Sequence, residues 1–220
     1  MTNHPGEDMA EIPVGKMLSL VVAQATVFVV IGLGLWFLSG RELNEFVTVD
    51  ARQIAIGLGI AGAMIAAGYL LFRGFPKFGE GLVRDQAQQF AFLEKRLGLG
   101  AIILLAACAG IGEEALFRGG LLVFGAEYIP FIGALIASSA IFTVIHFAKP
   151  KVAAFIFGIG MMFGAIYWST GSLLAVMIGH WVYDIWALWF IQEEMHRLGV
   201  FDKDTDDSEE VEDASSPPTP

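Results

Sequence analysis

Cysteine is almost absent from this chain, which has a single one, Cys108, among its 220 residues. One cysteine forms neither an intrachain disulfide nor a metal site built from several thiolates. Because Cys108 lies within an apolar run, we interpret it as a packed thiol. The sequence also lacks an HExxH pattern, the local signature of many zinc proteases.

Basic residues are scarce as well. The chain has 13 lysines and arginines against 23 acids, and its formal net charge is −10. It has no basic stripe, which argues against a nucleic-acid partner. Much of the acidity lies in residues 202–213, so it is a property of the tail and says little about a functional site.

Hydrophobic residues, in contrast, make up 55% of the chain, a share too large for an ordinary soluble domain. Each apolar segment is close to the ~20 residues that a helix needs to cross a ~30 Å hydrocarbon layer. A continuous helix satisfies its own backbone hydrogen bonds in lipid. The sequence therefore predicts an all-α, polytopic transmembrane helical bundle of about six membrane helices, at residues 17–38, 54–72, 97–124, 129–147, 152–168 and 172–191.

The charged and polar stretches divide the chain into five parts. Residues 1–15 form a polar N-terminal segment, and residues 16–74 hold two supporting transmembrane helices. Residues 75–96 form a cytoplasmic loop with an amphipathic helix, which either lies in the membrane interface or packs on the bundle. Residues 97–192 form a catalytic four-helix membrane core, and residues 193–220 form an acidic, disordered tail.

The loop charges predict the orientation. Loops on the cytoplasmic side of a membrane protein carry an excess of lysine and arginine. With a cytoplasmic N-terminus, ten basic residues fall on the cytoplasmic side and only Arg41 and Arg52 on the other. We therefore expect a multi-pass protein with both termini cytoplasmic, in the plasma membrane if the source is prokaryotic. The ten are Lys16, Arg73, Lys77, Arg84, Lys95, Arg96, Lys149, Lys151, Arg197 and Lys203.

Ionisable residues inside the apolar segments are concentrated in the second half of the chain. Such residues are costly in a bilayer, by ~2.5 kcal/mol or more each, and mark candidate functional sites. The first two segments contain no charged residue, which indicates a supporting role for them. The later segments contain three short patterns, Glu113-Glu114 with Arg118, Phe142 with His146, and His180 with Asp184.

Helical spacing predicts how some of these side chains pair. Glu114 and Arg118 are four residues apart, so they share a helix face and can form an ion pair. Glu113 lies about 100° around the helix from Glu114 and is free for another role. His180 and Asp184 are also four apart, so the carboxylate can orient the imidazole.

Phe142 lies one turn before His146 and is expected to form an apolar wall beside it. Each pattern alone is compatible with a structural role, such as a buried ion pair or an interhelical clamp. The three together favour catalysis or ion handling.

The three patterns, Glu-Glu-x-x-x-Arg, Phe-x-x-x-His and His-x-x-x-Asp, occur in this order on successive apolar segments. This order resembles the CAAX prenyl protease and bacteriocin-processing (CPBP) family of intramembrane glutamate-type proteases, over residues 97–191. The resemblance implies a membrane endopeptidase without a cofactor. Glu113 would be the general base and, with His146, would activate a water, while His180 and Asp184 would stabilise the oxyanion.

The resemblance gives Glu114 and Arg118 a supporting role. It also exposes a difference, because the prenyl-protease branch typically has asparagine at the position of Asp184. Asparagine can donate a hydrogen bond and an ionised aspartate cannot. Asp184 is therefore expected to orient His180 or to be protonated. The expected partners are the lipid bilayer and a peptide or protein substrate, and whether that substrate is lipidated stays open.

Two alternatives remain. A zinc-dependent membrane metalloprotease could use Glu113, His146 and His180 as ligands, with one position left for water. A non-catalytic immunity or scaffold protein could use the same pocket to bind a partner.

The depths of the site residues raise a further question. His146 lies near the end of its segment and Glu113 near the middle of its own. The helices are therefore offset, or the third segment breaks near Gly110 and Gly112, around a water-filled cavity that opens to the cytoplasm.

Overall fold

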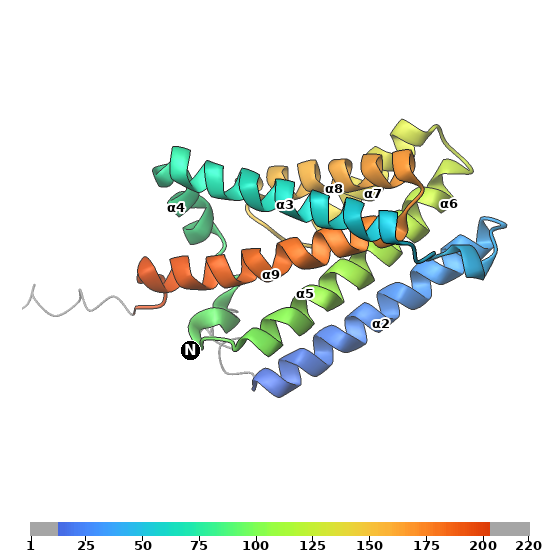
Figure 1. Ribbon diagram of the computed structural model, residues 1–220. Coiled ribbons are helices and arrows are strands. Elements are labelled where there is room, and N and C mark those ends of the chain that lie inside the picture. Colours follow the sequence, from blue (N-terminus) through green and yellow to red (C-terminus); the bar gives the residue numbers. More distant parts are fainter. Residues whose placement is uncertain (1–12, 203–220) are drawn as a thin grey trace, which may run out of the picture.

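The structure, a computed structural model, describes residues 13–202, and all regular structure in this range is helical (Figure 1). The predicted segment at residues 1–15 falls outside this range apart from residues 13–15, and so do residues 203–220 of the predicted tail. In chain order the elements are α2 (Val14–Leu38), η1 (Leu43–Glu45), α3 (Ala51–Gly74), α4 (Pro76–Asp85), η2 (Ala91–Glu94), α5 (Leu99–Glu114), η3 (Ala115–Leu122), α6 (Val123–Ala126), α7 (Phe131–Val144), α8 (Pro150–Thr170) and α9 (Leu173–Arg197).

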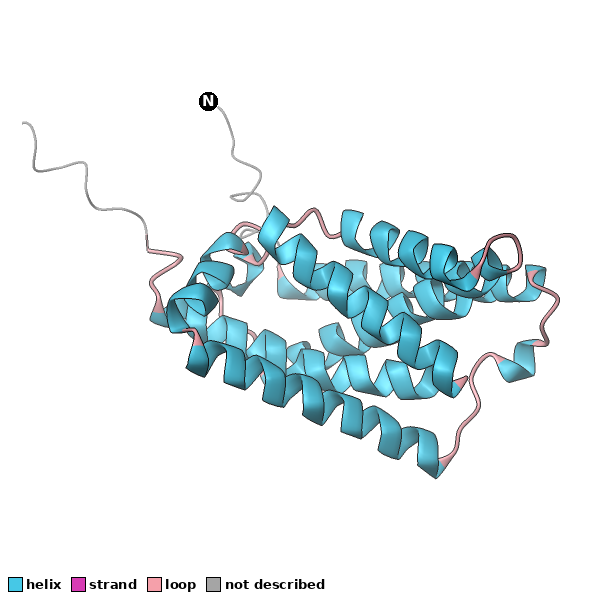
Figure 2. Ribbon diagram, turned by 90° about the horizontal axis from the view of Figure 1, so that it is seen from above, coloured by secondary structure: helices cyan, strands magenta, loops and turns pink. Residues whose placement is uncertain are grey.

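Helix α9 is the central element of the bundle. It packs along both α3 and α5, while α2 packs against α5 and η3, and α7 pairs with α8. Figures 1 and 2 show the long helices running roughly side by side, with α4 at one end and η1 and α6 at the other. The start of α2 and the end of α9 lie at the same end as α4.

Two glycines allow α9 to approach its neighbours closely. A Cβ atom on Gly110 of α5 would lie 2.7 Å from the backbone nitrogen of Trp181, and one on Gly57 of α3 would lie 2.8 Å from the carbonyl oxygen of Ala175. Neither distance is compatible with a side chain. Small residues thus determine the spacing of these membrane helices.

The helix boundaries follow ordinary capping chemistry. Asp50 accepts a hydrogen bond from the backbone nitrogen of Arg52 at the start of α3, and Ser172 accepts one from Ala175 at the start of α9. Pro150 occupies the first turn of α8, where a missing N–H costs nothing. Gly171 ends α8 with a φ of 66°, a left-handed conformation that glycine adopts readily.

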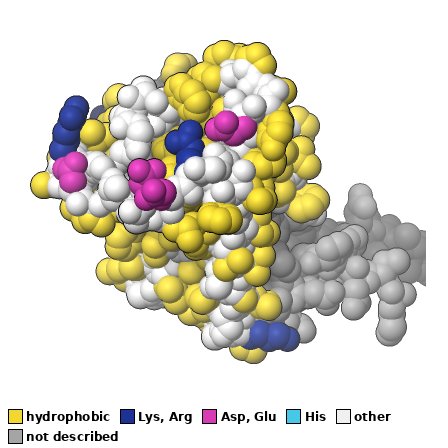
Figure 3. Space-filling view, turned by 90° about the vertical axis from the view of Figure 1, so that its right-hand side faces the viewer, with side chains coloured by type: hydrophobic (Ala, Val, Ile, Leu, Met, Phe, Trp, Pro, Cys, Tyr) yellow, Lys and Arg dark blue, Asp and Glu magenta, His cyan; other side chains and the backbone are white. Residues whose placement is uncertain are grey.

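The outside of the bundle is apolar. Five helices, namely α2, α3, the continuous α5–α6 segment, α8 and α9, are long and apolar enough to cross a membrane. Figure 3, which views the end with η1 and α6, shows few charged side chains among extensive hydrophobic surface. The chain is therefore an integral membrane protein, as the composition predicts.

The sixth apolar helix, α7, is shorter than expected. It has 14 residues and ends at Val144, where the sequence predicted a membrane segment at residues 129–147. His146 consequently lies in a turn beyond the helix, and the next residue, Phe147, has a φ of 47° and is 92% exposed.

The third membrane segment does not break at its glycines. Regular α-helix continues past Gly110 and Gly112 to Glu114, and a π-helix, η3, follows from Ala115. Within this π-helix, the Phe117 carbonyl accepts a hydrogen bond from the Ser138 hydroxyl of α7 at 2.9 Å.

The segment between α3 and α5 folds back onto the bundle. Val83 of α4 and Leu93 of η2 are fully buried in a cluster with Met195 of α9. Helix α9 continues to Arg197, which binds Glu80 of α4. The prediction of disorder from residue 193 is therefore wrong for residues 193–197, because these residues pack against α4 and η2.

Candidate active site

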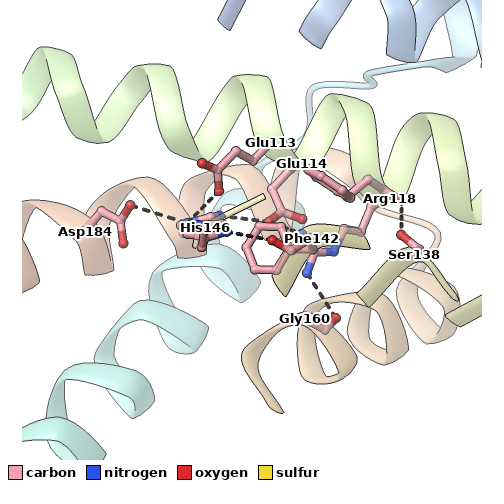
Figure 4. Close-up of polar contacts among 10 residues, drawn as sticks. Glu113, Glu114, Arg118, Ser138, Phe142, His146, Gly160 and Asp184 are labelled. Atoms are coloured by element: carbon pink, nitrogen blue, oxygen red, sulfur yellow. Dashed lines mark hydrogen bonds and ion pairs between the residues drawn. The ribbon is translucent and has the colours of Figure 1, made fainter. Parts of the chain in front are cut away.

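One cavity of about 340 Å³ contains all four residues that the sequence singled out for chemistry. Glu113 comes from α5, His146 from the turn after α7, and His180 and Asp184 from α9. In Figure 4, Glu113, His146 and Asp184 approach a common region from three parts of the fold. Because α7 ends at Val144, His146 lies in a turn at the wall of the cavity that Glu113 also lines.

Glu114 lies behind the cavity and joins two of its neighbours. Its Oε1 atom accepts hydrogen bonds from Arg118 at 2.9 Å and from Nδ1 of His180 at 2.8 Å. Arg118 also donates to the carbonyl of Gly160 on α8 at 3.0 Å (Figure 4). Because Glu114 and Arg118 are almost wholly buried, this network connects α5, η3, α8 and α9 away from water.

Aromatic rings enclose the same network. The Arg118 guanidinium lies 4.8 Å from the centre of the Phe142 ring and 5.5 Å from that of Phe163. Phe163 in turn stacks on the His180 ring at 5.2 Å, with 18° between the ring planes. The plane and the direction of the His180 ring are therefore fixed by stacking as well as by Glu114.

With its Nδ1 atom bound to Glu114, His180 directs Nε2 toward two further carboxylates. The Asp184 Oδ2 atom is 3.3 Å away and the Glu113 Oε2 atom is 3.9 Å away. Ionised carboxylates only accept hydrogen bonds, so this environment suits an imidazolium that carries a proton on Nε2. Such a group is a donor at the cavity wall.

His146 is held differently. Its Nδ1 atom lies 2.6 Å from the carbonyl oxygen of Phe142, which accepts hydrogen bonds only, so Nδ1 carries the proton. In the neutral imidazole, Nε2 then offers a lone pair. The His146 carbonyl accepts a hydrogen bond from the Gln89 side chain at 3.0 Å, which attaches the turn to the segment after α4.

The structure brings the predicted groups together, with one partnership that spacing did not predict. The pairs Glu114–Arg118 and His180–Asp184 form as expected, and the Phe142 ring lies 4.7 Å from the His146 ring. The bond from His180 to Glu114 was missed because the two residues are 66 positions apart.

Sequence reasoning also missed Gln89 and Phe163, which contact His146 and His180. Gln89 lies in a loop and Phe163 in an apolar run, and neither position carries a local signal of function.

The zinc alternative needs three converging ligands. Within residues 13–202, no three His, Cys, Asp or Glu side chains lie in an arrangement that could hold a metal ion. Glu113, His146 and His180 line one cavity, and one nitrogen of each imidazole is bound to Phe142 or Glu114. The second nitrogen of each ring remains available to another partner.

Residues 95–186 match the family described as type II CAAX prenyl endopeptidase Rce1-like. The chain is similar to this family over that region. The matched region begins just before α5 and ends within α9, so it contains the three motifs and the four cavity residues named above. The similarity supports a membrane protease. No curated protein and no solved structure matches it significantly.

Proposed function

We propose that this chain is an endopeptidase that cleaves a peptide bond inside the membrane with a water activated by Glu113 and His146. The observation that carries the proposal is the single cavity lined by Glu113, His146, His180 and Asp184. Similarity to the type II CAAX prenyl endopeptidase family supports a CAAX-protease-like membrane endopeptidase. The roles below are those that the resemblance implies, and the shared cavity supports them.

Glu113 would be the general base. Its carboxylate takes a proton from water, and the oxygen attacks the peptide carbonyl carbon while His146 holds the water through Nε2. The carbonyl electron pair becomes an oxyanion. When the tetrahedral intermediate collapses, the carbon–nitrogen bond breaks and the proton on Glu113 passes to the leaving amine. The reaction consumes one water and leaves the enzyme unchanged.

His180 would stabilise the oxyanion. An Nε2–H group at the cavity wall is a charged donor, and such donors act strongly where water is excluded. Glu114 and Asp184 bind the two nitrogens of this ring, at 2.8 and 3.3 Å. Asp184 would therefore act through His180, whose ring it orients and whose positive charge it balances.

The proposal includes an orientation. Both termini would be cytoplasmic, because the start of α2, α4 and the end of α9 lie at one end of the bundle and carry Lys16, Lys77, Arg84 and Arg197. The cavity is lined partly by Gln86 and Gln89 of the segment after α4, so it would open toward the cytoplasm and its water.

The decisive experiment is cleavage of quenched-fluorescent peptides, some with a prenylated C-terminus, by purified protein in detergent. We expect the wild type to cleave, and Glu113→Gln to lose activity by at least about 10²-fold. Glu127→Gln is the matched control, because Glu127 is exposed at the opposite end and pairs only loosely with Arg41, at 3.9 Å. Unchanged cleavage by Glu113→Gln would disprove the role of Glu113.

Adding a chelator to the cleavage assay tests the proposal that the reaction needs no metal ion. Activity should persist in excess chelator. Loss of activity that added zinc restores would instead make Glu113, His146 and His180 candidate metal ligands. A folded wild type that cleaves no peptide in the library would contradict the proposed activity.

A further inference from the structure

A second cavity adjoins the catalytic one. It has a volume of about 170 Å³ and lies between α3, α4, α8 and α9. The two cavities share wall residues, among them Val152, Ile156, Tyr183 and Ala187. The side pocket therefore borders the cavity that Glu113 and His146 line.

The side pocket differs from the catalytic cavity in chemistry. Its walls carry no Asp, Glu, His, Lys or Arg, and large apolar side chains dominate them, including Leu71, Phe72, Phe155 and Phe190. The amide nitrogen of Gln86, one of its polar groups, already donates to the Leu82 carbonyl at 3.1 Å. An occupant would gain free energy by burying apolar surface and would find no charged partner.

The volume limits the occupant. An engineered cavity of about 150 Å³ lined by Leu, Ile and Phe stays dry and holds one benzene molecule. A pocket of about 170 Å³ is therefore matched to one aromatic ring or one branched aliphatic side chain.

The position of the side pocket shows how close its occupant would lie to the catalytic residues. Ala187 lies three residues after Asp184 on α9, so the two share a helix face. The small Ala187 side chain lines both cavities, so it lies where the side pocket borders the catalytic cavity. A group in the pocket is therefore within one helical turn of Asp184.

We infer that the side pocket is a specificity subsite that receives one large apolar side chain of the peptide substrate, close to the bond that is cut. This inference rests on the proposed endopeptidase function. It makes Ala187 and Phe155 specificity-determining residues and predicts a preference for Leu, Met or Phe over Ala at one substrate position.

The test is a set of peptides that differ at one position, measured as kcat/KM at each position in turn. For the wild type, we expect Leu or Phe to exceed Ala by about tenfold or more at one position. Ala187→Leu should fill part of the space beside the side pocket and lower the ratio of kcat/KM for the Leu peptide to that for the Ala peptide by about tenfold. Phe155→Ala should widen the pocket and favour Trp, and its 43% exposure makes the protein tolerant of this change.

Photo-crosslinking gives a readout that does not depend on turnover. A peptide with a diazirine analogue of leucine at the preferred position, bound to Glu113→Gln, should label α3 or α8 around Leu71 and Phe155. The inference would be overturned if Ala187→Leu changed kcat/KM equally for all peptides, or if the crosslink formed elsewhere. Lipid chains would then be the expected occupants of the pocket. A wild type that cleaves nothing contradicts the endopeptidase function, whereas cleavage without any side-chain preference contradicts the subsite alone.

Discussion

At the scale of single residues, Glu114 connects the supporting structure to the chemistry. One of its oxygens serves both Arg118 and His180, and Arg118 reaches across to α8. Buried charges of this kind are stable only while their partners remain, because an unpaired charge in a low-dielectric interior is costly.

Arg118→Met should therefore lower the free energy of unfolding by about 3–5 kcal/mol, since it removes the guanidinium partner of the buried Glu114 and leaves only His180 beside it. Chemical or thermal unfolding in detergent measures the loss, and Arg52→Met, on an exposed residue, provides the control. The double variant Glu114→Gln with Arg118→Met should lose less free energy of unfolding than the sum of the losses in the two single variants. A loss for Arg118→Met as small as that for Arg52→Met would disprove the buried network.

Asp184 offers a second test at this scale. An asparagine side chain has both a donor and an acceptor, so Asp184→Asn can still bind Nε2 of His180 in either protonation state. We expect Asp184→Asn to keep kcat within about tenfold of the wild type. Asp184→Ala should reduce kcat by about 10²–10³-fold, the usual effect of losing oxyanion stabilisation. Equal activity of the two variants would show that the hydrogen bond to His180 is not needed.

Spacing in the sequence predicted only the partnerships within one helix. A separation of four residues was enough to place Arg118 beside Glu114 and Asp184 beside His180. The contact between Glu114 and His180 depends on how two helices pack, and nothing in either local pattern encodes it.

At the scale of elements, the distance between α5 and α9 decides where the site groups meet. Glu113 belongs to the first helix and His180 and Asp184 to the second. Gly110 brings the two backbones together, because no side chain fits between it and Trp181.

Gly110→Ala should therefore push α9 away from α5. We expect a loss of about 1–3 kcal/mol in stability from the added methyl group and a clear fall in kcat/KM. Gly100→Ala is the matched control on the same helix, because a Cβ atom there meets nothing within 4 Å. Unfolding curves and peptide cleavage measure both effects. Equal behaviour of the two variants would show that this close approach does not position the site.

The number and order of membrane helices could be predicted from the sequence, and the irregular elements could not. Apolar runs of about 20 residues indicate a spanning helix wherever they occur. The π-helix after Glu114 cannot be distinguished by composition from the α-helix before it, because the mostly apolar run continues through Ala115–Leu122. The early end of α7 was missed for the same reason, because residues 144 and 145 are still apolar.

At the scale of the whole molecule, the charges at the two ends predict the orientation. In a Cys108→Ala background, Glu127→Cys should react with a membrane-impermeant maleimide on intact cells. Lys77→Cys should react only after lysis, because Lys77 of α4 lies at the opposite, basic end. The reverse pattern of labelling would place both termini outside the cytoplasm.

The length of α7 has a consequence for the lipid around it. Fourteen residues rise about 21 Å, against a hydrocarbon thickness of about 30 Å. A short helix creates hydrophobic mismatch, and the bilayer relieves it by thinning locally. Head groups and water then come closer to the turn that carries His146. The thickness of the host membrane, and not only the chemistry of the cavity, would help to set how readily water reaches the bond to be cut.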